Sequence, residues 1–176
     1  MGAAEKARRF EELHQGNELF LMPNPWDLGS ARLLEALGFP ALATTSSGHA
    51  ATLGRHDQRV SRDEMLDHVT QMATAVDVPL NVDSERCFGE TPDEVAATVR
   101  AIADRGAAGC SIEDYDPTTR SIDPLEPAVE RVAAAAGAAH AATTPMVLTA
   151  RAEQHLYGDA DLDDTIARLS AFRDAG

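Results

Sequence analysis

Two acidic residues, Asp83 and Glu85, stand one residue apart directly after a short apolar segment at residues 78–82. The segment predicts a buried strand, and a parallel strand presents side chains at its carboxyl end, where α/β proteins carry their chemistry. Two carboxylates this close repel each other, and Mg²⁺ is a hard cation that takes oxygen ligands. The pair therefore indicates a magnesium site, although taken alone it is also typical of a solvated acidic turn.

Polar residues also follow three other apolar segments, at residues 41–44, 109–112 and 146–149. They are Ser46, Ser47, Glu113, Asp114 and Arg151. The loop at residues 45–49 is rich in hydroxyl and backbone N–H groups, which can hold a carboxylate or a phosphate. One acidic turn is common by chance, but polar residues at the carboxyl ends of several strands favour an active site.

Helix signals alternate with these segments and with a further apolar segment at residues 19–22. Helices are expected at residues 3–15, 30–37, 62–75, 92–105 and 124–141, and after Asp161. Caps or capping boxes begin four of them, at Asp27, at Ser61 with Glu64, at Thr91 with Glu94, and at Asp161 with Asp164. In the last helix, an apolar stripe is expected to face the core: Leu162, Ile166, Leu169 and Phe172.

This alternation predicts an α/β fold with a parallel sheet and helices outside it. The fold class expected is a parallel (β/α) barrel of the TIM type, incomplete because only five of the eight strands are found. The prediction is a single domain over residues 1–176 that lacks the C-terminal strands. An exposed edge beside the fifth strand would favour aggregation, so a partner chain is expected to cover it and the protein to be a homo-oligomer.

Composition excludes some classes of partner. The formal net charge is −14, which argues against nucleic acid and anionic membranes because both require basic surfaces. No apolar run is long enough for a membrane span, and no signal-peptide pattern is found. Cys87 and Cys110 form no disulfide framework, so a cytoplasmic location is expected.

Five motifs occur in a specific order along nearly the whole chain. They are residues 24–32 (NPWDLGSAR), 43–48 (ATTSSG), 81–89 (NVDSERCFG), 111–114 (SIED) and 149–153 (TARAE). Each motif is weak alone, but the ordered set resembles the isocitrate lyase / phosphoenolpyruvate mutase superfamily.

That resemblance implies a modified (β/α)₈ barrel, usually oligomeric, that uses Mg²⁺ to make or break a C–C or C–P bond beside a 2-oxo acid or enolate. The substrate would be a small 2-oxo or 2-hydroxy acid. The implied metal ligands, partly through water, are Asp83, Glu85 and Glu113. The implied substrate-binding residues are Ser46, Ser47, Gly48 and Arg151, with Arg151 as a bidentate carboxylate or phosphonate clamp. Asp57 matches a family acid close to the substrate, so Asp57 and Arg151 are the expected catalytic residues.

The sequence departs from the family pattern in three places. The lyases carry a K-R-C-G-H loop after the I-E-D motif, whereas residues 115–120 here (YDPTTR) contain no Cys, His or Lys. Glu85 replaces an aspartate, which keeps the carboxylate but lengthens its reach. Cys87 stands where glycine is usual, and we interpret it as an incidental thiol because no base is evident beside it.

Other enzyme classes fit less well. A Schiff-base aldolase needs a lysine at a strand end, but Lys6, the only lysine, precedes the first strand. A hydrolase built from Ser46 or Ser47 with His49 or His56 lacks a nucleophile-elbow motif. The sequence thus predicts a Mg²⁺-dependent lyase or mutase, and the alternative is a non-catalytic metal- or carboxylate-binding remnant of this fold.

Overall fold

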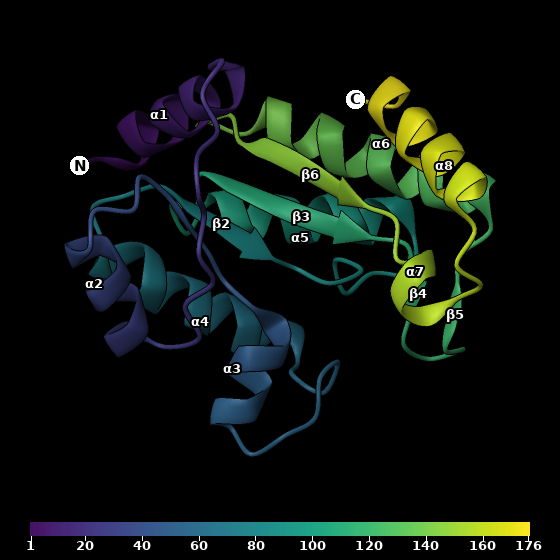
Figure 1. The fold of residues 1–176 in the computed structure, drawn as a ribbon, viewed down its shortest axis with the longest axis horizontal. Helices are drawn as coiled ribbons and strands as arrows, with labels where there is room; N and C mark the ends of the chain where they lie inside the picture. The colour runs from purple at the N-terminus through teal and green to yellow at the C-terminus, as the bar shows by residue number, and fades with distance from the viewer.

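The computed structural model describes residues 1–176 as a parallel four-stranded sheet with helices around it (Figure 1). The strand order is β1-β2-β3-β6, with every neighbouring pair parallel. The strands are β1 (Leu42–Ala43), β2 (Leu80–Asp83), β3 (Gly109–Glu113) and β6 (Val147–Arg151). This arrangement confirms the α/β fold with a parallel sheet.

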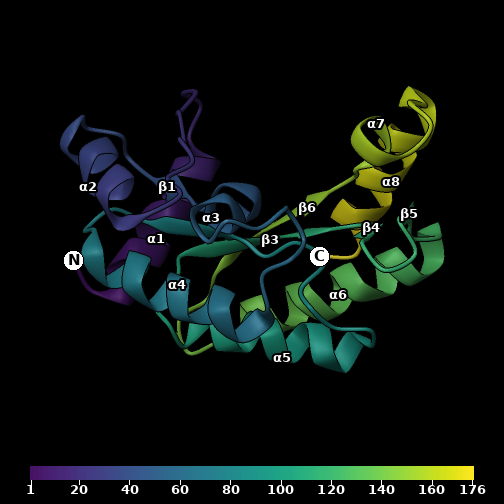
Figure 2. The same ribbon diagram turned by 90° about the horizontal axis from the view of Figure 1, so that it is seen from below.

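Three helices, α4 (Arg62–Ala75), α5 (Pro92–Ala103) and α6 (Leu125–Ala141), lie along one face of the sheet (Figure 2). α1 (Ala3–Gln15) contacts β6, and α2 (Leu28–Ala36) packs on α4 and β1. Short α3 (Ser46–Thr52) follows β1. After β6 come α7 (Gln154–Tyr157) and α8 (Leu162–Asp174), and α8 contacts α6 and β6. No helix has the length and apolar character needed to span a membrane.

The predicted caps form as expected. Asp27, Ser61 and Thr91 each accept the backbone N–H three residues later, and a reciprocal side-chain bond completes a capping box in all three cases. Asp161 caps α8 by accepting the N–H groups of Asp163 and Asp164. These bonds satisfy N–H groups that a helix start otherwise leaves without partners.

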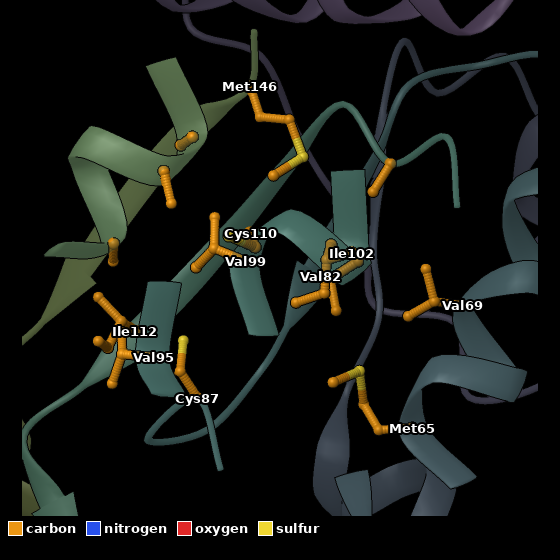
Figure 3. Close-up of a cluster of buried hydrophobic side chains, with 14 of the residues drawn as sticks. Met65, Val69, Val82, Cys87, Val95, Val99, Ile102, Cys110, Ile112 and Met146 are labelled. Atoms are coloured by element: carbon orange, nitrogen blue, oxygen red, sulfur yellow. The ribbon is translucent and has the colours of Figure 1, made fainter. Parts of the chain in front are cut away.

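Strand side chains alternate between an apolar face and a polar face. Val82, Cys110 and Ile112 point toward α5 and are fully buried against Val95, Val99 and Ile102 (Figure 3). Residues at the alternate positions point to the other face, because successive strand side chains point in opposite directions. They include Asn81, Asp83, Ser111, Glu113, Thr149 and Arg151. The apolar face holds the sheet on its helices and leaves the polar face for the site.

Two local predictions were wrong. Residues 19–22 form no strand: Leu19 and Leu21 are exposed, and a single nearby backbone bond, from Ala43 N–H to Pro23 O at 3.0 Å, joins this segment to β1. Proline has no N–H to donate, so Pro23 cannot extend that ladder. Residues 46–49, predicted as loop, begin α3, because the Thr45 side chain accepts the Gly48 N–H at 3.2 Å and caps the helix.

The predicted apolar stripe of the last helix is only partly buried. Phe172 is 2% exposed, whereas Leu162, Ile166 and Leu169 are 63%, 53% and 43% exposed. α8 touches β6 and α6 along the side that carries Phe172 and Arg168, so its remaining apolar residues face solvent. The expectation that all four residues lie in the core is therefore wrong.

Candidate active site

The carboxyl ends of β2, β3 and β6 open into a cleft of about 390 Å³. Residues lining it include Ser46, Ser47, Asp57, Asp83, Glu113 and Arg151. Six of the predicted site residues, from five separate segments, therefore meet in one cleft. Gly48 and Glu85 are the predicted site residues that do not line it.

Arg151 lies at the centre of this cluster. Its Nη1 is 3.0 Å from Asp83 Oδ1 and 3.3 Å from Glu113 Oε2, and its Nε and Nη2 are each 2.8 Å from Glu153 Oε1. Burial disfavours the charge on Arg151, but the attraction of these three carboxylates outweighs it and raises the pKa of Arg151. The guanidinium is thus charged and held in a defined orientation, with 35% of the side chain exposed.

Asp83 is held from the opposite side by the start of α3. Its Oδ2 accepts hydrogen bonds from the backbone N–H and the hydroxyl of Ser46, both at 2.8 Å. The backbone N–H of Asp83 donates to Thr44 Oγ1 at 2.9 Å. The donors of Ser46 therefore point at Asp83, which fixes the carboxylate between α3 and Arg151.

The other two residues of the predicted substrate loop, Ser47 and Gly48, have different surroundings. Ser47 is exposed at the cleft, with its hydroxyl 3.3 Å from Thr45 Oγ1. Gly48 instead uses its N–H in the α3 cap. A Cβ on Gly48 would lie 2.6 Å from Thr45 Cγ2 and 3.0 Å from Trp26 Cβ, so close packing requires glycine here.

Glu85 and Glu113 are buried acids. Burial, reinforced by the charges of Asp57, Glu113 and Asp83, raises the pKa of Glu85 to about 8. Burial also raises the pKa of Glu113 to about 7; Arg151 opposes this rise and Asp83 adds to it. Together with Asp57 and Asp83, these acids outnumber the single cation of the cleft, Arg151. The protein alone therefore does not stabilise all four acids in their ionised forms.

No three His, Cys, Asp or Glu side chains converge closely enough to hold a metal ion directly. The donor chemistry nevertheless fits Mg²⁺, because Asp83, Glu85 and Glu113 offer only carboxylate oxygens and lie close enough to repel one another. Glu85 reaches its position through a left-handed backbone conformation, with φ of 50°. Its carbonyl accepts the Glu113 N–H at 3.0 Å, which joins the two acidic segments.

Some cleft residues carry no sequence signal. Gln58, with φ of 61°, donates from Nε2 to Glu113 Oε1 at 3.0 Å, and its Oε1 is buried without a partner. The neighbouring Asp57 lies at the cleft and accepts the Gln58 N–H at 3.0 Å. Tyr157 lines the same cleft. Neither Gln58 nor Tyr157 belongs to a recognisable motif, so sequence reasoning missed both.

A buried ion pair between Arg168 and Asp114 is linked to Arg151 through Glu153. Arg168 Nη1, on α8, donates to Asp114 Oδ2 at 3.3 Å and to the Asp123 carbonyl at 2.9 Å. Asp114 Oδ1 accepts the backbone N–H of Glu153 at 2.8 Å, and Glu153 in turn holds Arg151. This chain of contacts links α8 to the cleft.

Residues 115–120, where the lyases carry a catalytic cysteine, take part in a small antiparallel hairpin of β4 (Tyr115–Asp116) and β5 (Ser121–Ile122). No Cys, His or Lys lines the cleft. Cys87 and Cys110 are both free and fully buried, and burial raises the pKa of the Cys87 thiol to about 11. At neutral pH Cys87 is therefore a thiol and a poor nucleophile.

Comparison with known proteins adds independent information. A crystal structure of a candidate lyase/mutase from Burkholderia cenocepacia J2315 superposes with a TM-score of 0.95 at 48% identity, over 99% of this chain and 63% of that chain. The oxaloacetate decarboxylase of Paraburkholderia xenovorans (strain LB400) is 31% identical over 100% of this chain and 60% of its own length. The 2-methylisocitrate lyase of Escherichia coli (strain K12) is 32% identical over 83% of this chain and 51% of its own length.

The chain thus spans between half and two thirds of the length of these relatives. The family model for phosphoenolpyruvate phosphomutase matches residues 10–176, which include every motif described above. This match shows that the chain belongs to the phosphoenolpyruvate mutase family, within the isocitrate lyase / phosphoenolpyruvate mutase superfamily. The acids at the strand ends and the arginine that pairs with them are in keeping with that family.

Proposed function

We propose that this chain carries the site of a Mg²⁺-dependent lyase or mutase acting on a small 2-oxo or 2-hydroxy acid. The reaction would break or rearrange a C–C or C–P bond next to an enolate. One observation carries the proposal: Arg151 is held among Asp83, Glu113 and Glu153 in an open cleft at the strand ends. A charged, oriented guanidinium there can bind a substrate carboxylate through a charge-assisted hydrogen bond.

The excess of acids over cations in the site supports a divalent cation. The raised pKa values of Glu85 and Glu113 fit this proposal, because a bound cation would favour the ionised forms of both acids. Asp83, Glu85 and Glu113 would hold Mg²⁺, partly through water. When bound, Mg²⁺ stabilises negative charge that develops on an enolate oxygen.

The remaining roles follow from position. Arg151 and Ser47, which lines the cleft at the start of α3, would bind the substrate carboxylate, and Asp57 would act beside the reacting atoms. Ser46 instead orients Asp83, and Gly48 gives its N–H to the α3 cap. The named curated relatives favour C–C over C–P chemistry, since an oxaloacetate decarboxylase and a 2-methylisocitrate lyase both cleave carbon–carbon bonds. A 2-oxo diacid such as oxaloacetate is accordingly the first substrate to test.

Calorimetric titration with oxalate, an enolate mimic, with and without Mg²⁺ tests the proposal. Binding that depends on Mg²⁺ is expected, because the acids alone repel a dianion. Oxalate binding that is absent in both conditions would contradict it.

The second candidate function is a non-catalytic metal- or carboxylate-binding remnant. The hairpin at residues 115–122 favours it, because this segment lacks the cysteine of the lyases. Mg²⁺-dependent oxalate binding without turnover of any 2-oxo or 2-hydroxy acid would support the remnant, and turnover would exclude it.

We also propose a homo-oligomer in the cytoplasm. The exposed apolar residues of α8 beside β6 support self-association, because exposed apolar surface beside a strand edge favours contact with another chain. Sedimentation velocity measures the oligomeric state, and a monomer at all concentrations would contradict this part of the proposal.

A further inference from the structure

Tyr157 lines the cleft. It is the last residue of α7, which contacts β5 of the small hairpin (Figure 1). Its ring stacks on Tyr115 with centroids 3.8 Å apart and an interplanar angle of 17°. Tyr115 is buried and does not line the cleft, whereas Tyr157 does and remains 38% exposed. The stack thus fixes the ring of Tyr157 in the cleft wall.

Carbon–carbon cleavage beside a 2-oxo group requires a proton donor. When the bond breaks, its electron pair becomes an enolate, and the former bonding carbon must then take up a proton. The acid that the lyases use is a cysteine in the loop that residues 115–120 replace here. Another side chain of the cleft, or water, would therefore supply the proton if this chain completes the reaction.

Few side chains in the cleft can fill this role. No Cys, His or Lys lines it, and the hydroxyl of Ser46 already donates to Asp83. Asp83 and Glu113 pair with Arg151 and are the acids assigned to the metal, and Asp57 accepts the Gln58 N–H. A phenol is a stronger acid than the remaining serine and threonine hydroxyls, and Tyr157 is the phenol that reaches this cleft.

We propose that Tyr157 is the proton donor that completes the reaction, in place of the cysteine of the lyases. This inference rests on the proposed function and specifies how the same site would work. For a 2-oxo diacid, the bond between C3 and the leaving carboxylate breaks, CO₂ departs, and the electron pair forms the enolate. The Tyr157 hydroxyl then protonates C3 to give the 2-oxo acid, and water in the open cleft returns a proton to the phenolate.

The surroundings of Tyr157 keep its hydroxyl protonated until the proton is transferred to C3. Burial, with the charges of Asp57, Glu113 and Glu153, raises the pKa of its phenol above the ordinary value. Tyr157 therefore enters the reaction as an acid at neutral pH, and the phenolate left after proton transfer recovers its proton readily.

The chain has two tyrosines, so Tyr157→Phe and Tyr115→Phe form a matched pair. Both substitutions keep an aromatic ring in the stack, but only the first removes a hydroxyl from the cleft. Oxaloacetate decarboxylation with Mg²⁺ is measured in the full chain, together with deuterium exchange at C3 of pyruvate and oxalate affinity. Tyr157→Phe should lower kcat and the exchange rate by about 100-fold, the low end for a general acid, with KM and the oxalate Kd nearly unchanged. Tyr115→Phe should stay within about threefold of wild type.

The outcomes separate this inference from the proposed function. Wild-type chain that binds no oxalate contradicts both. Wild-type turnover that Tyr157→Phe leaves unchanged, or that both variants reduce equally, overturns the role of Tyr157 alone. Oxalate binding with neither turnover nor exchange also overturns it, because a donor in place would exchange the C3 protons of pyruvate.

Discussion

Arg151 Nη1 donates to Asp83 Oδ1 at 3.0 Å, joining the ends of β6 and β2 across the intervening β3. The arginine expected to bind substrate and the acid expected to bind metal are thus one unit. A change to either residue should alter the position of the other, so metal and substrate affinities should be coupled.

Arg151→Lys should weaken oxalate binding by about tenfold or more, because an ammonium cannot reproduce the bidentate fork of a guanidinium. Isothermal titration in the presence of Mg²⁺ measures the change. Arg8→Lys is the control, since Arg8 is exposed on α1 and pairs with Glu12. Equal affinities for Arg151→Lys and wild type would remove Arg151 from the site.

Asp83→Asn should abolish measurable Mg²⁺ binding at millimolar concentrations. The amide keeps the shape of the carboxylate and can still accept from Ser46, but it lacks the charge that a hard cation needs. Asp93→Asn, at an exposed acid in the first turn of α5, is the matched control. An unchanged Mg²⁺ titration in Asp83→Asn would refute the metal assignment.

Arg168→Met should destabilise the fold by about 3 kcal/mol, because it leaves the buried Asp114 carboxylate without its cation. Denaturant unfolding measures this loss. Arg173→Met, on the same helix, removes an exposed arginine that pairs only with Asp174, and should change stability by less than about 0.5 kcal/mol. Similar losses in both variants would show that the Arg168–Asp114 pair has no special role.

The buried His68 should make the fold sensitive to acid. Its ring stacks on His49 with centroids 3.7 Å apart, and burial, aided by His49 and opposed by Asp27, lowers its pKa to about 4. Unfolded chain therefore binds more protons than folded chain between about pH 4 and the ordinary histidine pKa of about 6.5. The neutral ring contributes full stability above pH 6.5, and this contribution falls as the pH drops toward 4.

His68→Leu removes this titration. Between pH 6.5 and 4, wild type should lose about 2–3 kcal/mol more unfolding free energy than the variant. Glu85 and Glu113 titrate in both proteins with the opposite sign, so the difference between the two pH profiles isolates His68. Parallel profiles would show that His68 does not titrate in this way.

Local signals in the sequence determined most of the secondary structure. The caps at Asp27, Ser61 and Thr91 act within three residues, so the chain alone specifies where α2, α4 and α5 begin. The alternation of apolar and polar residues in β2 and β3 likewise determines which side chains enter the core. Because carboxyl ends of parallel strands share one edge, the gathering of Asp83, Glu113 and Arg151 was also predictable.

Only the tertiary structure decided how these residues pair. The bond from Ser46 to Asp83, the bond from Gln58 to Glu113 and the stack of Tyr157 on Tyr115 join residues that are 37, 55 and 42 positions apart in the sequence, respectively. The exposure of Leu162 and Ile166 is similar, because helical spacing shows an apolar stripe but not what covers it. Periodicity and capping act over a few residues, whereas pairing and burial depend on the packing of the whole chain.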